Sequence, residues 1–186
     1  MVGLGNPGRE FAGTRHNLGA DAVRVVAERH GADLRAEKGQ RAILAEVTIG
    51  SHRVALAVPT AYVNESGDAV RPLMRRFGIQ DPTRLVVVHD ELDLPPGRLR
   101  VKEGGGTAGH NGLRSIQAHI HSPDFVRVRL GIGKPRTAEQ GADHVLSRPS
   151  RRERELLEEV TRRAADVVED IATDGVDAAM NRWNSG

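Results

Sequence analysis

The sequence predicts an α/β protein: a single-domain, three-layer sandwich in which helices flank a mixed, mostly parallel, twisted β-sheet. Three observations lead to this fold class. Segments with strand-like apolar patterns alternate along the chain with segments whose apolar residues recur at helical spacing. The apolar run 85–88 is typical of a strand buried on both faces. The length of 186 residues favours one domain, which we assign to residues 1–186.

Several segments are predicted to form strands, namely 1–4, 42–49, 53–58, 85–88, 98–102 and 126–132. Gly50-Ser51 suits a two-residue hairpin turn between the second and third of these, because glycine accepts the positive φ that such turns require. The segments 98–102 and 126–132 alternate strictly between polar and apolar residues. We therefore expect both to be half-exposed strands.

Helices are predicted between these strands. Asn17 can cap a helix that runs to about residue 30, and apolar positions 70, 73, 74 and 77 define one face of a second helix. Leu113, Ile116 and Ile120 mark a third. Ser150 and Glu153 form a capping-box pattern at the start of a long helix, for which Gly175 is the expected end.

The composition excludes several classes of site. The chain has no cysteine, which excludes disulfides, thiolate metal sites and a cysteine nucleophile. The net charge is only +2, so a nucleic-acid site has to be a local basic patch. No apolar run approaches the roughly 18 residues that a membrane span needs, and no signal-peptide pattern opens the chain. We expect a cytoplasmic protein.

The first motif, Gly3 to Gly8, matches the spacing G-x-G-x-x-G. A dinucleotide-binding fingerprint needs a full strand before the glycines and a helix that opens within them. Here the strand is very short, and Pro7 disfavours helical angles at Asn6. A nicotinamide-dependent oxidoreductase is therefore the weakest alternative. We interpret the segment as a rigid loop that presents Asn6, with a plain tight turn as the other reading.

Two further motifs supply the histidines and carboxylates of a candidate site. Thr14-Arg15-His16-Asn17 precedes the first helix, and His89-Asp90-Glu91 follows the buried strand, where α/β proteins place their sites. A carboxylate such as Asp90 can accept the ring N–H of a histidine, which fixes its tautomer for proton transfer. Metal binding is a rival reading, drawn from one set of residues: His89, Asp90, Glu91, His110, His119 and His121. None of them shows a recognised ligand spacing, so we expect no metal and no cofactor.

Glycine-rich turns surround His110 and Asn111. Such turns can cradle phosphate or let backbones pass closely. The amide of Asn111 could donate to a substrate oxygen, whereas Asn64 could be catalytic or only a helix cap. No G-x-S-x-G elbow occurs, so a His–carboxylate pair most simply activates water directly.

Two basic rows complete the pattern. Arg98, Arg100 and Lys102 share one face of a strand, and Arg127 and Arg129 share one face of another. Such rows are commonly solvated surfaces. Two of them beside a candidate site also make a phosphate-binding surface.

These motifs together resemble the bacterial peptidyl-tRNA hydrolases. The similarity runs from Gly3 to Asn181 and rests on four signatures in the family's order: GLGNPG, TRHN, HDELDLPPG and GGG-x-x-GHNGL. The resemblance implies a monomer that hydrolyses the ester between a peptide and the 3′ end of tRNA and contacts the acceptor stem.

The resemblance also implies roles for individual residues. His16 matches the catalytic histidine and Asp90 the aspartate that supports it. Asn6, Asn64 and Asn111 match asparagines that line the peptide and water site, and His110 matches a histidine beside that site. Lys102 and Arg129 match the pair that binds the tRNA 5′-phosphate.

The chain departs from the family at three places. Fewer residues precede GLGNPG, which predicts a shortened first strand. Phe11 stands where many members have Tyr, and Val63 replaces the usual Met, which leaves a smaller apolar wall.

A non-catalytic RNA-binding relative with the same fold is the main alternative, because fold alone does not decide activity. The presence of His16, Asp90 and all three asparagines favours the enzyme.

Overall fold

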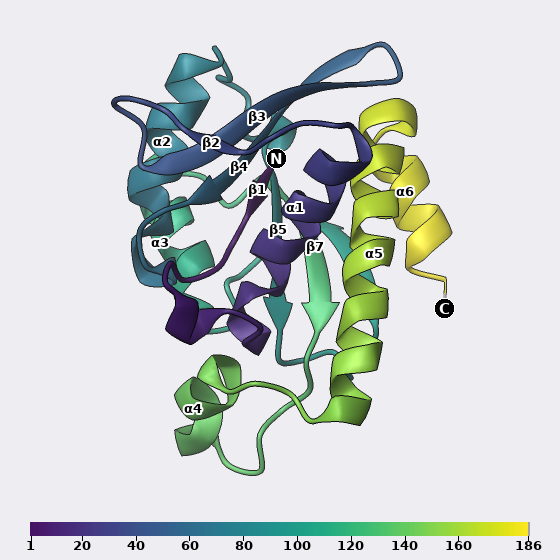
Figure 1. Cartoon of the computed structure of the whole chain (residues 1–186). Coiled ribbons are helices and arrows are strands. Elements are labelled where there is room, and N and C mark those ends of the chain that lie inside the picture. Colours follow the sequence, from purple (N-terminus) through teal and green to yellow (C-terminus); the bar gives the residue numbers. More distant parts are fainter. Residues whose placement is uncertain (186) are drawn as a thin grey trace.

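The computed structural model describes residues 1–185, in which a seven-stranded β-sheet carries helices on both faces (Figure 1). The strand order is β2-β3-β4-β1-β5-β7-β6. The neighbours β4, β1, β5 and β7 are parallel, whereas β2, β3 and β6 add antiparallel pairs toward the edges. The strands are β1 (Val2–Gly3), β2 (Arg35–Ala36), β3 (Ala42–Ile49), β4 (His52–Pro59), β5 (Val86–Glu91), β6 (Leu99–Glu103) and β7 (Val126–Gly131). The expected α/β fold with a mixed sheet is confirmed.

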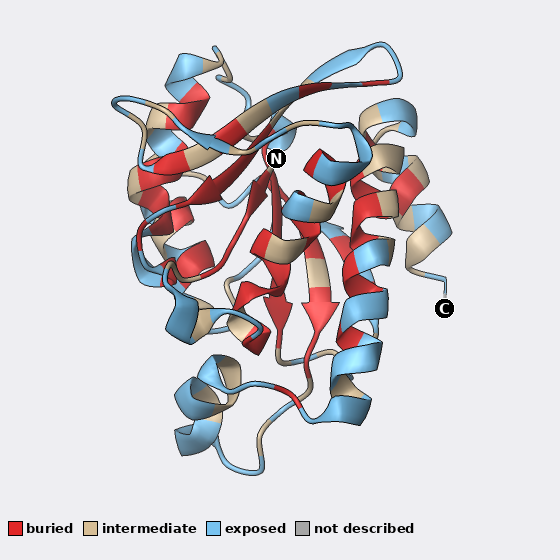
Figure 2. Ribbon diagram, in the orientation of Figure 1, coloured by how far each residue is buried: buried red, intermediate tan, exposed pale blue. Residues whose placement is uncertain are grey.

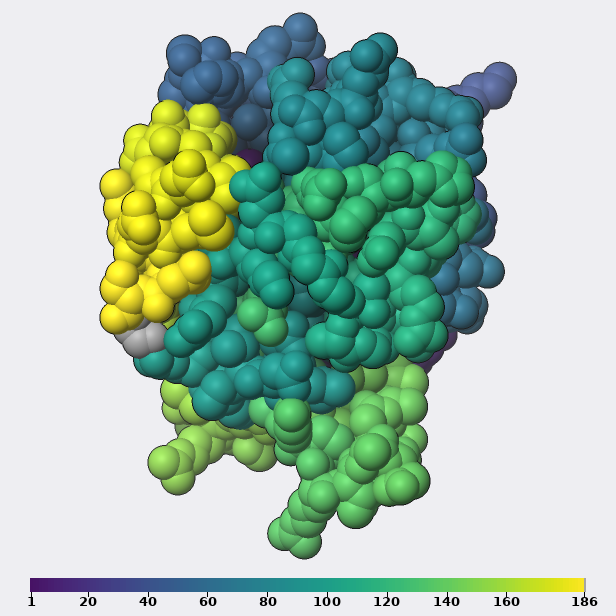
Figure 3. All heavy atoms as spheres, turned by 180° about the vertical axis from the view of Figure 1, so that it is seen from behind, coloured from purple at the N-terminus to yellow at the C-terminus, as the bar shows by residue number. Residues whose placement is uncertain are grey.

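The helices are α1 (Leu18–Arg29), α2 (Ser66–Arg76), α3 (Asn111–Ile120), α4 (Gly141–Leu146), α5 (Arg151–Asp174) and α6 (Val176–Trp183). Residues of α1, α5 and α6 share one hydrophobic cluster with one face of the sheet, and residues of α2 and α3 share another with the opposite face. The segment with α4 projects from the end of the molecule at which β5 and β7 terminate (Figures 1 and 3). No helix of residues 1–185 has the length and apolar character needed to cross a membrane.

The core follows from the pleat of the central strands. In β5, Val86 and Val88 pack toward α1 and α5, while Val87 packs toward α2 and α3. Both faces of a parallel strand between two helical layers are apolar for this reason. Buried residues follow the middle strands, and exposed residues occupy the outer sides of the helices (Figure 2).

The expectation that 126–132 forms a half-exposed strand is wrong. Every residue of β7 is buried except Arg129, which is intermediate. Arg127 is only 2% exposed, and its guanidinium donates to the main-chain carbonyls of Gly105, Gly106 and Pro123. An arginine that finds carbonyl acceptors can occupy the polar position of an alternating pattern without reaching solvent. Strand β6 does alternate as expected, with Arg100 and Lys102 exposed.

Two of the predicted helix caps differ in the structure. The first helix begins after Asn17, but the Asn17 side chain makes no cap hydrogen bond. Helix α2 begins at Ser66 with Glu65 in the cap position, so the reading of Asn64 as an N-cap is wrong. Ser150 does cap α5 by accepting from the Glu153 N–H, and α5 ends at Gly175 as expected.

The Gly50-Ser51 hairpin is confirmed between β3 and β4. Gly50 has φ +60°, which is the left-handed conformation that favoured glycine at this turn.

Candidate active site

A cleft of about 860 Å³ opens at the end of the sheet where β5 terminates. Its lining includes the side chains of Asn6, Phe11, His16, Tyr62, Val63, Asn64, Asp90, Leu92, His110, Asn111, Val145 and Leu146. All of the residues predicted to surround the ester therefore lie along one cleft. Leu92 and the wall formed by α4 were not foreseen, because their apolar side chains carry no chemical signature in the sequence.

His16 lies on a 3-10 turn, Arg15–Asn17, that leads directly into α1; we call it the His16 turn. Helix α1 is unusually close to the sheet at this end. A Cβ at Gly19 would lie 2.1 Å from the carbonyl oxygen of Val88, and one at Gly3 would lie 2.2 Å from the carbonyl oxygen of Gly19. Because only glycine permits this approach, the two glycines bring the His16 turn against the end of β5.

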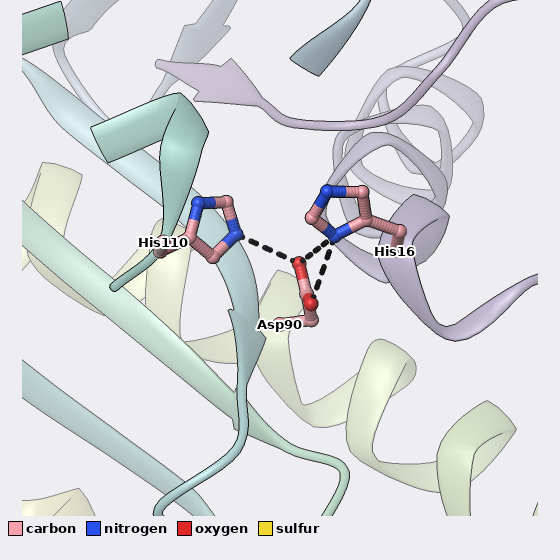
Figure 4. A group of neighbouring side chains, drawn as sticks. All are labelled: His16, Asp90 and His110. Atoms are coloured by element: carbon pink, nitrogen blue, oxygen red, sulfur yellow. Dashed lines mark hydrogen bonds and ion pairs between the residues drawn. The ribbon is translucent and has the colours of Figure 1, made fainter. Parts of the chain in front are cut away.

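Asp90 accepts hydrogen bonds from two histidines. The Nδ1 of His16 lies 3.0 Å and 2.9 Å from the two carboxylate oxygens of Asp90, and the Nε2 of His110 lies 2.9 Å from Oδ1. Figure 4 shows the two rings on opposite sides of the carboxylate, with the second ring nitrogen of His16 directed away from it. The predicted contact between His16 and Asp90 is therefore present.

The hydrogen bonds define the protons on both rings. The Nδ1 of His110 faces the N–H groups of Gly112 and Leu113 at the start of α3, so it is an acceptor and Nε2 carries the proton given to Asp90. His16 uses Nδ1–H toward Asp90, which leaves the Nε2 lone pair available to the cleft. This is the tautomer that a histidine base requires.

Electrostatics favour a charged Asp90 and a basic His16. Burial raises the pKa of Asp90, but the two histidines outweigh burial through charge and hydrogen bonding, and hold this pKa well below its ordinary value. Burial lowers the pKa of His16, yet the charge and hydrogen bonds of Asp90 raise it further than burial lowers it. The imidazolium that forms on proton abstraction is therefore stabilised.

His89 is fully buried behind the pair. Its Nδ1–H donates to the main-chain carbonyl of Asp90 at 2.7 Å, and its ring meets the His110 ring edge-on at 5.0 Å between centroids. Within residues 1–185 its Nε2 has no hydrogen-bond partner. Burial is the main cause that lowers the pKa of His89 to about 3, so this histidine is neutral.

Asn6 is held by a second asparagine. The side-chain carbonyl of Asn17 accepts from the Asn6 N–H at 2.9 Å, and its amide donates to the Asn6 carbonyl at 3.0 Å. The side-chain oxygen of Asn6 accepts from the Val63 N–H at 2.8 Å. The Gly3–Gly8 segment is therefore a loop fixed to its neighbours, as interpreted, and no helix opens within it.

The remaining predicted residues take different places in the cleft. Asn111 is the first residue of α3 and is exposed, as is Asn64. Val63 is buried, and Phe11 contacts Tyr62 in an edge-to-face pair. Exposed amides at the cleft can bind substrate, whereas Val63 and Phe11 contribute apolar wall.

Lys102 and Arg129, the predicted phosphate-binding pair, lie outside the lining of the cleft, which instead includes Lys134 and Arg136. Lys102 is exposed on β6, and Arg129 lies on the neighbouring strand β7, where its Nε donates to Glu91 at 2.9 Å. Arg127, which belonged to the same predicted row, is buried and is not a surface contact. The solvent-facing basic surface is thus smaller than the sequence pattern indicated.

One group of residues in 1–185 could hold a metal: candidate ligand atoms of His16, Asp90 and His110 all lie within 4.8 Å of one another. A metal there would have to displace the protons that both histidines donate to Asp90. His119, another residue of the metal reading, pairs with Asp68. The absence of a metal requirement stays a prediction.

The fold and the site together define a class: an α/β protein with a buried carboxylate that orients two histidines at the carboxyl end of its central strands. Comparisons with known proteins identify its family. The chain belongs to the peptidyl-tRNA hydrolase family, whose sequence model matches residues 1–186.

Relatives and solved structures match over nearly the whole chain. A peptidyl-tRNA hydrolase of Cutibacterium acnes is 46% identical over 197 residues, which cover 100% of this chain and 97% of the relative. One of Chloroflexus aggregans is 45% identical, covering 99% and 97%. The crystal structure of peptidyl-tRNA hydrolase from Acinetobacter baumannii has a TM-score of 0.94 and 40% identity, covering 99% of this chain and 93% of that one. The resemblance inferred from the four motifs is confirmed.

Proposed function

We propose that this protein is a peptidyl-tRNA hydrolase, in which residues 1–186 act as one domain that cleaves the ester between peptide and tRNA. The products are free tRNA and peptide, which return to translation. Membership of the family over the whole chain supports the reaction. The observation that carries the assignment is the His16–Asp90 contact, because it leaves a basic nitrogen facing a cleft of suitable size.

His16 acts as the general base. Its Nε2 removes a proton from water, and the hydroxide attacks the ester carbonyl carbon. Asp90 keeps the Nδ1–H tautomer and stabilises the imidazolium, while His110 keeps Asp90 ionised. When the tetrahedral intermediate collapses, the carbon–oxygen bond to the ribose breaks and His16 returns the proton to the 3′ oxygen. A positioned base of this kind contributes roughly 10²–10⁴-fold.

Asparagine amides surround the reacting ester. Asn111 holds the water and donates to the oxyanion, together with Asn64, and such a donor is typically worth about 3–4 kcal/mol. The free amide N–H₂ of Asn6 pairs with the first peptide bond of the substrate. An uncapped aminoacyl-tRNA offers no such bond and must also lose the hydration of its charged amine, so it reacts more slowly.

Binding of tRNA uses charges beyond the cleft. Lys102 and Arg129 contact the 5′-phosphate of the acceptor stem, and the 3′ end enters the cleft. Arg129 already binds Glu91, so Lys102 supplies the uncompensated charge of the pair. The protein works in the cytoplasm as a monomer and needs neither a metal nor an organic cofactor.

The decisive experiment measures release of N-acetyl-amino acid from N-acetyl-aminoacyl-tRNA, with a chelator present, by wild type, His16→Ala and the control His52→Ala. His52 is exposed at the start of β4, remote from the cleft. We expect turnover by wild type and the control, and a loss of roughly 10²–10⁴-fold in His16→Ala. Tight tRNA binding without turnover in wild type would instead indicate the non-catalytic RNA-binding relative.

A further inference from the structure

We propose that Arg15 is a positioning residue for His16, acting through an ion pair with Glu153 that fixes the His16 turn to the start of α5. The inference rests on the proposed function, because it names a side chain on which the geometry of the base depends. Arg15 does not line the cleft and touches no substrate in the proposed reaction.

Each side chain of the His16 turn binds a different part of the fold. His16 binds Asp90 on β5, and Asn17 binds the main chain of Asn6. Arg15 binds Ser147 just after α4 and Glu153 in the first turn of α5. Because its three side chains bind three different parts of the fold, this three-residue turn has little freedom to rotate. Removal of the Arg15 contacts therefore allows His16, the middle residue, to move.

The ion pair between Arg15 and Glu153 is bidentate. The Nε and Nη2 of Arg15 donate to the two carboxylate oxygens of Glu153 at 2.7 Å and 2.6 Å. The arginine side chain is 9% exposed and the glutamate side chain 19% exposed. Paired charge-assisted bonds away from solvent constrain both distance and orientation, unlike a surface ion pair.

The third nitrogen of the guanidinium binds the end of α4. Nη1 of Arg15 lies 3.2 Å from the carbonyl oxygens of His144 and Ser147, and 2.5 Å from the Ser147 hydroxyl. The main-chain N–H of Arg15 also donates to the Ser147 carbonyl at 3.3 Å. Arginine is required here, because lysine cannot direct separate donors at a carboxylate and at carbonyls in one plane.

Glu153 is diverted from the role that its spacing predicts. In a complete capping box its carboxylate would reach back to the N–H of Ser150. Only the other half forms, in which the Ser150 hydroxyl accepts from the Glu153 N–H, while the carboxylate binds Arg15. Helix α5 thus presents a partly buried carboxylate to a residue 138 positions earlier in the chain.

Arg15 therefore fixes the position of the His16 turn relative to the end of α4. Arg15 directly precedes His16 in the chain, and its guanidinium binds the end of α4, whose Val145 and Leu146 line the same cleft as His16. Loss of the ion pair lets the His16 ring move away from Asp90 without removing either catalytic group. Misplacement of a reacting group by about 1 Å can lower the rate roughly 100-fold.

The test compares Arg15→Met, Arg15→Lys and Glu153→Gln with wild type. The matched control is Arg151→Met, which removes a 95% exposed arginine from the same end of α5. The measurements are kcat and KM for N-acetyl-aminoacyl-tRNA, the pH dependence of kcat/KM, and the melting temperature. A second arm follows the titration of the His16 ring by NMR, which needs no turnover.

We expect kcat to fall roughly 10- to 100-fold in Arg15→Met and Glu153→Gln, with KM changed less than about threefold. Arg15→Lys should recover only part of the loss. The acidic limb of the pH profile and the His16 titration should both move to lower pH, because the influence of Asp90 weakens while burial remains.

Unchanged kcat per folded molecule and an unmoved His16 titration, with only a lower melting temperature, would overturn the proposal and leave Arg15 as a purely stabilising residue. If Arg15→Met does not fold, Glu153→Gln and Arg15→Lys decide the question in the same way. If wild type is inactive, the proposed function fails, and the NMR arm still tests whether Arg15 positions the ring.

Discussion

The side chain of Asn17 forms a pair of hydrogen bonds with the main chain of Asn6, accepting from its N–H at 2.9 Å and donating to its carbonyl at 3.0 Å. This contact joins the residue after His16 to the Gly3–Gly8 loop. The Asn6 side chain in turn accepts from the Val63 N–H. Within residues 1–185 the amide N–H₂ of Asn6 makes no such contact, so it is available to donate to a substrate.

Asn6→Ala should reduce the preference for N-acetyl-aminoacyl-tRNA over aminoacyl-tRNA by roughly tenfold, since one hydrogen bond to the peptide is lost. The measurement is the ratio of kcat/KM for the two substrates. Asn6→Asp provides the comparison, because it keeps the acceptor for Val63 and loses the donor. If Asn6→Asp retains the full preference, Asn6 acts only by holding Val63.

Asp90→Asn should lower kcat on the order of 10²–10⁴-fold while leaving tRNA affinity nearly intact, because the tautomer and charge of His16 lose their support. In wild type, kcat/KM should rise with pH through the pKa of His16, which lies above 6.5. In the variant this limb should move to lower pH, since Asp90 raises the pKa and burial alone lowers it. The exposed Asp177→Asn is the control. An unchanged acidic limb in Asp90→Asn would show that His16 is not the titrating base.

Lys102→Ala should raise KM roughly tenfold with little change in kcat, because a charged hydrogen bond to phosphate is lost outside the cleft. The slope of log(kcat/KM) against log salt should fall by about one. Arg35→Ala, an 80% exposed arginine on the distant edge strand, controls for general charge. Loss of turnover at saturating substrate in Lys102→Ala would contradict the separation of binding from chemistry.

His89 should make the free energy of unfolding depend on pH. Its folded pKa of about 3 lies below the unfolded value of 6.5, so the unfolded chain binds the proton first as pH falls. Stability is therefore complete above pH 6.5 and declines toward pH 3, by about 1.4 kcal/mol per pH unit from this group. Denaturant unfolding from pH 7.5 to 4 should give a steeper decline in wild type than in His89→Asn, whose amide can replace the donor. Equal slopes would mean that His89 is protonated in the folded state.

The periodicity of apolar residues predicted the main strands and helices well. It predicted the exposure of a residue wrongly where a polar side chain hydrogen-bonds inside the protein. The alternation in β7 indicated a half-exposed strand, but Arg127 is buried against three carbonyls that come from a glycine-rich loop and from Pro123. A local pattern cannot reveal acceptors that lie elsewhere in the chain. The same holds for Asn17, which has the spacing of a cap and instead binds Asn6.

The candidate site was predicted residue by residue because polar groups occur there in distinctive motifs. Residue chemistry indicated a histidine–carboxylate pair, the family resemblance paired His16 with Asp90, and the structure brings them to 2.9 Å. Arg15 stood in the same motif without an assigned partner, since its acceptor Glu153 lies far away and matches an ordinary helix-start pattern. A contact between two residues that are far apart in the sequence can be recognised only from the folded structure.

The distance in sequence between Arg15 and Glu153 has a consequence for biogenesis. Chains fold as they emerge, beginning at the N-terminus, and pairings that are remote in sequence form late. A nascent chain can expose His16 and Asp90 to each other long before α4 and α5 have left the ribosome tunnel. The Arg15–Glu153 ion pair can form only after the start of α5 has emerged, so the His16 turn becomes fixed later than the His16–Asp90 contact can form.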